Sequence, residues 1–129
     1  MKANWDCEAL DDVMRGREDE HLPEWLVECL TRIFSAIADP TRVRILHALA
    51  GHDRLSVTEL AEHTGLSVSA VSHQLRLLRD RMLLKAQREG RSVLYSLADE
   101  HIRVLLCTGI EHAYEDCTNN LRREGQRAH

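Results

Sequence analysis

The sequence predicts a mainly α fold with a small β-hairpin wing, a winged helix-turn-helix, from three observations. Apolar residues recur at helical spacing over segments between residues 24 and 82. A glycine turn at Thr64-Gly65 separates two short helical segments, the second of which has one apolar and one polar face. Two strand-like runs follow, joined by a basic tip that contains glycine. With 129 residues and 43% hydrophobic content, the chain is long enough for one packed core.

The first predicted helix covers residues 24–38 and is either a core helix or a dimer helix. Its apolar positions follow helical spacing, namely Trp25, Leu26, Leu30, Ile33, Phe34 and Ile37. Asp39 then suits an N-cap and Pro40 the first position of a second helix. That helix stops at Gly51. We expect it to bury its apolar side chains, namely Val43, Ile45, Leu46 and Leu49.

Residues 56–82 predict the helix-turn-helix itself. Ser56 and Glu59 have the spacing of a capping box, in which each side chain satisfies a backbone N–H of the other residue. This helix ends at Thr64-Gly65, and Ser67 can cap the next one. The apolar stripe of the second helix consists of Val71, Leu75, Leu78 and Met82. Its opposite face carries Ser69, Ser72, His73 and Arg76.

The wing is predicted from two strand-like runs over residues 83–87 and 92–97. The four residues between them, Arg88 to Arg91, contain a glycine and two arginines. Such a pair of runs is a β-hairpin with a basic tip. A helix-turn-helix followed by a hairpin is a winged helix.

The charge distribution is compatible with a DNA-binding surface in the centre of the chain. The formal net charge is −4, but the charges are unevenly spread. Residues 41–91 carry 9 basic and 5 acidic groups, or +4; residues 1–40 carry 4 and 10, or −6; residues 92–129 carry 4 and 6, or −2. Local positive charge matters more for phosphate contact than the net charge of the chain.

We therefore expect this unit to bind double-stranded operator DNA. Short or planar polar groups on the second helix suit base edges and phosphates in the major groove, namely Ser67, Ser69, Ser72, His73 and Gln74. Arginines would contact phosphates and position the protein, namely Arg76, Arg79, Arg88 and Arg91. The alternative is that these residues are only the solvated faces of a helix and a hairpin.

Composition argues against several other classes. An aromatic content of 4% makes a stacking platform for single-stranded nucleic acid unlikely to form. No apolar run is long enough for a membrane span and the N-terminus lacks a signal-peptide core, so we expect a cytoplasmic protein without membrane contact. In that compartment the four cysteines are expected to be reduced thiols, namely Cys7, Cys29, Cys107 and Cys117.

Three regions follow from these patterns. Residues 1–22 form an acidic N-terminal extension, residues 23–117 a winged-helix domain for DNA binding and dimerisation, and residues 118–129 a polar C-terminal tail.

Two histidines eleven residues apart point to a metal site in the amphipathic segment Asp99–Cys117. His101 and His112 project from the same stripe of a helix, about 20° apart around its axis. Along the axis they are about 16 Å apart, whereas a metal–nitrogen bond is about 2 Å long. One helix therefore cannot bring both to one ion. Two antiparallel copies can, if Asp99 and His101 of one chain meet His112 and Glu115 of the other.

Three motifs carry a family resemblance: Ala38-Asp39-Pro40-Thr41-Arg42, Ser69-Ala70-Val71-Ser72-His73-Gln74-Leu75, and Gly90-Arg91-Ser92-Val93-Leu94-Tyr95-Ser96-Leu97. Together they resemble the ArsR/SmtB family of metal-responsive winged-helix repressors, over about residues 25–116. The resemblance implies a homodimer with an interface built by its first and last helices. It also implies that metal binding lowers the affinity for an operator.

The resemblance nominates Asp99, His101, His112 and Glu115 as metal ligands, paired across the dimer. Two nitrogen and two oxygen donors suit tetrahedral Zn(II), with Co(II) as a mimic, whereas Ni(II) prefers more ligands. Asp116 lies four residues after His112 and is an alternative to Glu115. The other interpretation makes the two histidines interface residues without a metal.

The sequence also allows other interpretations. A second class in the family binds metal through cysteines at the start of the helix before the recognition helix, but Ser56 and Thr58 stand there. Cys7 and Glu59, with His21 as a helper, are what remains for a second site.

A thiol- or oxidant-responsive repressor would use the four cysteines. We expect no enzyme, since four protein ligands leave no open position and no nucleophile–base pair is apparent. A winged-helix interaction module would bind no DNA.

Overall fold

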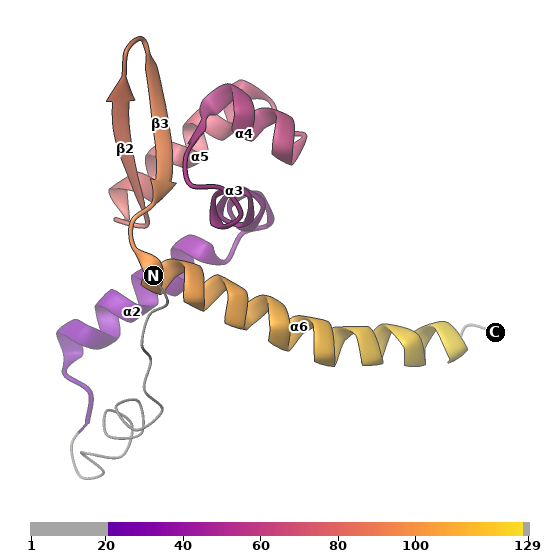
Figure 1. Ribbon diagram of the computed structural model, residues 1–129. Coiled ribbons are helices and arrows are strands. Elements are labelled where there is room, and N and C mark those ends of the chain that lie inside the picture. The colour runs from indigo at the N-terminus through magenta and orange to yellow at the C-terminus, as the bar shows by residue number, and fades with distance from the viewer. Residues whose placement is uncertain (1–20, 128–129) are drawn as a thin grey trace.

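The computed structural model describes residues 21–127, except for the side chains of residues 117–121, 126 and 127. The elements follow one another as α2 (Glu24–Ile37), α3 (Pro40–Ala50), β1 (Leu55–Ser56), α4 (Val57–Thr64), α5 (Val68–Asp80), β2 (Leu84–Glu89), β3 (Ser92–Leu97) and α6 (Glu100–Arg127). Figure 1 shows α3, α4, α5 and the β2–β3 hairpin grouped together, while α6 extends away from this group. The predicted mainly helical fold with a β wing is confirmed.

The core sits around α3, which contacts α4, α5, α6 and the sheet. Ile45, Leu46 and Leu49 on α3 are completely buried. Leu60 from α4 and Leu78 from α5 are buried against them in the same cluster. Full burial of one such side chain contributes about 1.5–3 kcal/mol, so this cluster determines how the two helices of the helix-turn-helix sit on α3.

The helix-turn-helix has the predicted caps. The Ser56 hydroxyl accepts from the Glu59 backbone N–H at 3.2 Å, and the Glu59 carboxylate accepts from the Ser56 backbone N–H at 3.0 Å. Gly65 ends α4 with φ +73°, a left-handed conformation that glycine adopts without a Cβ clash. The Ser67 hydroxyl then caps α5 by accepting from the Ala70 N–H at 3.1 Å.

The wing is part of a three-stranded antiparallel sheet in the order β1-β3-β2. β2 pairs with β3 from Leu84 opposite Leu97 to Glu89 opposite Ser92, and Gly90 makes the tip with φ +63°. β2 thus extends two residues beyond the predicted run. β1 was not predicted, because two residues are too short to show an alternating pattern.

Two side chains that were expected in the core are exposed. Val43 on α3 is 42% exposed, and Met82 is 80% exposed. Met82 lies beyond α5 with φ +62°, and its N–H donates to the Arg79 carbonyl, while the Leu83 N–H donates to the Leu78 carbonyl. These two bonds form a Schellman motif, in which the residue after the left-handed one packs back onto the helix. Leu83 therefore occupies the core position predicted for Met82.

The last helix is longer than the segment the sequence indicated. α6 continues beyond Cys117 to Arg127, so residues 118–127 prolong the helix. Asp99 precedes α6, and its carboxylate accepts from the Ile102 backbone N–H at 3.2 Å. Ile102 and Leu106 anchor the start of the helix to the core.

Replacing Ser56 with alanine tests the capping box. The Ser56→Ala variant loses the hydroxyl that satisfies the Glu59 N–H, so its free energy of unfolding should fall by about 1 kcal/mol in urea titrations. Thr58→Ala in the same helical turn is the matched control, since Thr58 is exposed and has no capping role. Equal losses in the two variants would contradict the cap assignment.

Candidate nucleic-acid interface and metal-ligating residues

The two faces of α5 are cleanly separated in the structure. Val71, Leu75 and Leu78 are at most 1% exposed and face the core. The candidate DNA-contacting residues on the other side are exposed, namely Ser69, Ser72, His73, Arg76 and Arg79. An exposed polar helix held rigidly from behind is the arrangement that places side chains in a major groove.

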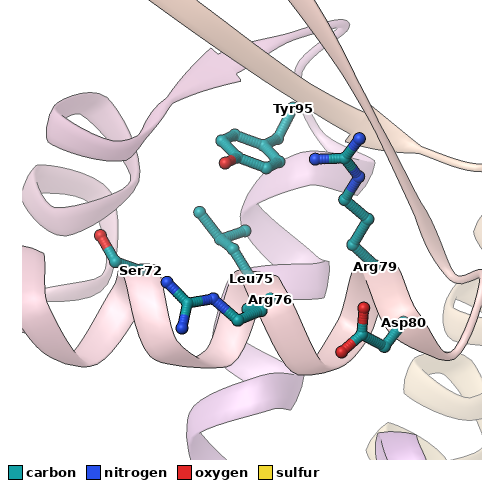
Figure 2. Close-up of a pocket in the computed structure, with 6 residues that line it drawn as sticks. All are labelled: Ser72, Leu75, Arg76, Arg79, Asp80 and Tyr95. Carbon is teal, nitrogen blue, oxygen red and sulfur yellow. The ribbon is translucent and has the colours of Figure 1, made fainter.

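A concave surface of about 580 Å³ lies between α5 and the sheet. It is lined by Ser72, Leu75, Arg76, Arg79, Asp80 and Tyr95 (Figure 2). Figure 2 shows the Arg79 guanidinium extending from α5 towards the strands, the Arg76 guanidinium lying along the helix, and the Tyr95 ring from β3 above Leu75. Guanidinium groups at a concave surface suit a phosphate, which accepts two parallel hydrogen bonds from one arginine. The sequence did not indicate Asp80 or Tyr95 as part of this surface. Tyr95 lies on β3, and it reaches α5 only because β3 pairs with β2 in the folded chain.

The wing adds two further exposed arginines. Arg88 lies on β2 opposite Val93, and Arg91 follows Gly90 at the tip. Arg54 lies 3.8 Å from Glu89 of β2, between the Nη1 and Oε2 atoms. Since both of these side chains are exposed, we ascribe to this pair at most a small contribution to stability.

Gln74 differs from the other candidate DNA contacts. It is only partly exposed, and its amide oxygen accepts from the Arg42 guanidinium at 3.3 Å. Arg42 also donates to the carbonyls of Ala36 at 2.7 Å and Ser35 at 3.4 Å, at the end of α2. The Arg42 guanidinium therefore links α2 to α5 and orients the Gln74 side chain. The sequence did not predict this link. The Ser67 hydroxyl accepts a capping bond, and its proton stays available to a phosphate.

The structure places the candidate metal ligands in two separate groups, one at the start of α6 and one further along it, where His112 pairs with Asp116 rather than with the nominated Glu115. At the start of the helix, His101 Nδ1 lies 3.4 Å from Asp99 Oδ1. Further along, His112 Nε2 lies 3.0 Å from Asp116 Oδ2, so that Asp116 contacts His112 within the chain, and Glu115 is exposed beside it. Each pair supplies one nitrogen and one or two carboxylates, a donor set that suits a divalent metal.

Neither pair is a complete metal site in a single chain. Within residues 21–127, as far as side chains are described, no group of three histidines, cysteines or acidic residues is placed to hold a metal ion. All four side chains of the two pairs are more than half exposed and accessible to a second copy. A site that uses both pairs requires two chains.

Two of the four cysteines have side chains that the structure describes. Cys29 and Cys107 are both exposed free thiols in the single chain. Cys7 lies outside the described residues, and the side chain of Cys117 is likewise outside them. Glu59 keeps its capping bonds, and these two bonds to Ser56 hold its pKa below the usual value.

Comparison with known proteins identifies the family. The profile of the bacterial regulatory proteins of the arsR family matches residues 39–85, from the N-cap of α3 to the start of β2. The "HTH-type transcriptional regulator NmtR" of Mycobacterium tuberculosis is 41% identical over 99 residues, which cover 77% of this chain and 82% of that protein. This chain belongs to the arsR family of bacterial regulatory proteins.

Two further similarities extend the comparison. The "Transcriptional repressor SmtB homolog" of a Synechocystis strain is 48% identical over 86 residues, which cover 67% of this chain and 64% of that protein's length. Among solved structures, the homodimeric winged helix-turn-helix DNA-binding domain of a possible ArsR-family regulator from Mycobacterium bovis superposes with a TM-score of 0.66. It is 27% identical and covers 75% of this chain and 92% of that domain.

As a member of the arsR family, the chain is a transcriptional regulator and not an enzyme, as the sequence predicted. The winged helix-turn-helix fold is likewise confirmed. Over residues 21–127, no helix combines the length and the hydropathy that a membrane crossing requires.

Substitutions of arginine test the phosphate contacts. Arg76→Ala and Arg91→Ala should each weaken binding to all duplexes and lower the slope of log affinity against log salt by about 0.9, since each phosphate contact releases a counterion. Arg122→Ala is the matched control, because it removes the same charge from an exposed site on α6. Fluorescence anisotropy at several salt concentrations measures both quantities.

Substitutions on the polar face of α5 test base contacts. Ser72→Ala and His73→Ala should lower the preference for operator over random duplex by about tenfold each, without changing the salt slope. If these two variants and the two arginine variants all bind DNA like the parent chain, the assignments of recognition helix and wing are wrong.

Proposed function

We propose that this chain is a homodimeric repressor that binds operator DNA and leaves it when Zn(II) binds between its C-terminal helices. The observation that carries the proposal is the placement of two incomplete donor pairs on one exposed helix. The "Transcriptional repressor SmtB homolog", 48% identical over 86 residues, supports the regulatory role. DNA binding is supported by the exposed polar face of α5 and by the arginines around the groove in Figure 2.

Exposed apolar side chains support a dimer. On α2, Trp25 is 65% exposed and Phe34 is 54% exposed, and on α6 Tyr114 is 73% exposed. Figure 1 shows that α2 and α6 are the two helices outside the group formed by α3–α5 and the hairpin. Large apolar groups on the outermost helices mark a protein interface, and a second copy of the chain is the partner that the homodimeric structural relative suggests.

The donor set supports a site shared by two chains. Asp99 and His101 of one chain would join His112 and Glu115 of the other, and each dimer would hold two such sites by symmetry. Two imidazoles and two carboxylates fit Zn(II), with Co(II) as a mimic. Bound there, the metal would tie the two C-terminal helices together. Asp99 Oδ1 and His101 Nδ1 lie 3.4 Å apart, about the spacing of two ligand atoms on one tetrahedral zinc ion.

The link through Arg42 supports coupling between the dimer interface and the DNA-binding face. One guanidinium joins the end of α2 to Gln74 on α5, so a change at the interface that moves α2 also acts on α5. A dimer reads two half-sites at a fixed spacing, and a small rigid shift is enough to spoil simultaneous contact. The coupling is reciprocal: if zinc weakens operator binding by some factor, operator weakens zinc binding by the same factor.

A second candidate function is favoured by the exposed thiols of Cys29 and Cys107. Accessible thiols are what an oxidant-responsive repressor needs. Replacing all four cysteines with serine separates the two functions. A cysteine-free chain that zinc still releases from operator eliminates the thiol model, and loss of the response eliminates the zinc site on α6.

The main test of the shared site is His112→Ala. The variant loses one ligand in each of the two sites, while the residues of the DNA-binding face are unchanged. It should dimerise and bind operator like the parent chain, but zinc should no longer release it in an anisotropy titration. His101→Ala should behave in the same way.

Mixed dimers of the two variants give the decisive control. In a dimer of one His101→Ala chain and one His112→Ala chain, one of the two sites receives both histidines from unmutated positions. Zinc should therefore bind with half the stoichiometry of the parent dimer. A site within one chain would give no rescue, because every chain lacks one ligand. Absence of rescue, or zinc-driven release of His112→Ala, would overturn the shared site.

The identity of the fourth ligand can be tested by two neutral substitutions. Glu115→Gln removes a charged ligand and should lower zinc affinity by more than about 100-fold, whereas loss of a partner that only orients His112 costs about 10–100-fold. Asp116→Asn, which alters the 3.0 Å contact to His112, should therefore have the smaller effect in calorimetric titrations. The reverse order would assign the fourth position to Asp116.

A further inference from the structure

We propose that His52 and His63 form a second metal-binding site, for an ion such as Zn(II) that prefers imidazole ligands. His52 lies in the turn after α3, and His63 lies in the last turn of α4. Their ring centroids are 4.5 Å apart. This pair lies within one chain, and neither histidine belongs to the donor pairs on α6.

The ring geometry is close to that of a two-histidine chelate. A zinc–nitrogen bond of about 2.0–2.1 Å and a tetrahedral angle place the centroids of two bound imidazoles about 5 Å apart. The observed separation of 4.5 Å is close to that value. The rings are tilted by 45°, so they are not stacked face to face.

A backbone hydrogen bond prepares His52 as a ligand. Its Nδ1 atom lies 2.8 Å from the Ala48 carbonyl oxygen. A carbonyl oxygen only accepts, so Nδ1 must carry the proton, and in the neutral ring the lone pair is on Nε2. Metal-binding histidines usually donate their second N–H to a carbonyl or carboxylate in this way, which fixes the ring and its tautomer.

The surroundings are open to solvent and carry charges of both signs. Both histidines line a cavity of about 420 Å³, together with Arg44, His47 and Thr64. The pKa of Glu59 is lowered mainly by its bonds to Ser56, and to a lesser extent by the charges of His63 and His52. The Glu59 carboxylate favours a cation at the two imidazoles, whereas the Arg44 guanidinium that lines the same cavity opposes one.

The site would use two protein ligands, with water at the other positions. Within the described side chains, no third histidine, cysteine or acidic residue is placed to complete a closed site. Because both ligands come from one chain, binding should not depend on dimerisation. A bound ion would also connect the end of α3 to the end of α4, so zinc should raise the melting temperature of the chain.

The test begins with a full-length chain that carries His101→Ala and His112→Ala, which removes the donors proposed on α6. Zinc titration by calorimetry should still find one site per chain. Adding His52→Ala or His63→Ala should lower its affinity by about tenfold or more. His73→Ala, which removes an exposed imidazole from α5, is the control for zinc binding at single surface histidines and should leave the zinc affinity unchanged.

The double variant His52→Ala/His63→Ala distinguishes a chelate from two independent ligands. Two residues that hold one ion are coupled, so the double variant should lose less affinity than the sum of the two single losses. Additive losses, or an equal loss in the His73→Ala control, would overturn the proposal. The background lacks the α6 histidines, so this outcome is independent of whether zinc releases the operator.

A second measurement needs no further variants. In nitrogen–proton spectra of the imidazole rings, substoichiometric zinc should shift the Nε2 signals of His52 and His63 together, while His52 Nδ1 stays protonated. A shift of one ring without the other would also overturn the proposal.

Discussion

Burial of α3 is the constraint on which the rest of the structure depends. Three of its side chains, Ile45, Leu46 and Leu49, are completely excluded from solvent and contact elements on several sides. Because α5 can bury its own apolar stripe only against this cluster, its polar face must point outward. The same packing brings β3 next to α5, which creates the concave surface with two arginines in Figure 2. The shape of the candidate DNA interface is thus a consequence of the core.

Local patterns predicted most of the fold because capping and periodicity act over a few residues. The capping box at Ser56, the turn at Gly65 and the strand pairing up to Leu97 all depend on such short-range chemistry. The features that were missed depend on tertiary contacts. Met82 adopts a left-handed conformation because Leu83 takes the core position, and Gln74 turns to Arg42 although its neighbours face solvent. A helical wheel shows the position of a residue around one helix but not the residues of other elements that its side chain contacts, so it cannot predict either arrangement.

The apolar residues of α2 also show that a helical pattern does not identify the partner of a side chain. Trp25 and Phe34 have the spacing of a buried stripe, yet more than half of each side chain is exposed in the single chain. Periodicity shows that a helix has an apolar face but not whether the same chain or a second copy covers it. For the proposed metal ligands the second copy is essential, because each site would take two of its four ligands from each chain.

Two pairs of histidines in this chain have the same sequence separation, but the distance between the two residues is long in one pair and short in the other. His101 and His112 are eleven residues apart on one continuous helix, which places them about 16 Å apart along its axis. His52 and His63 are also eleven residues apart, but a turn and β1 lie between them and reverse the chain, so their rings are 4.5 Å apart. The first pair requires a second chain to share an ion, and the second does not. A metal on α6 can therefore report on the relation between two chains, whereas a metal at His52 and His63 would act on the packing within one.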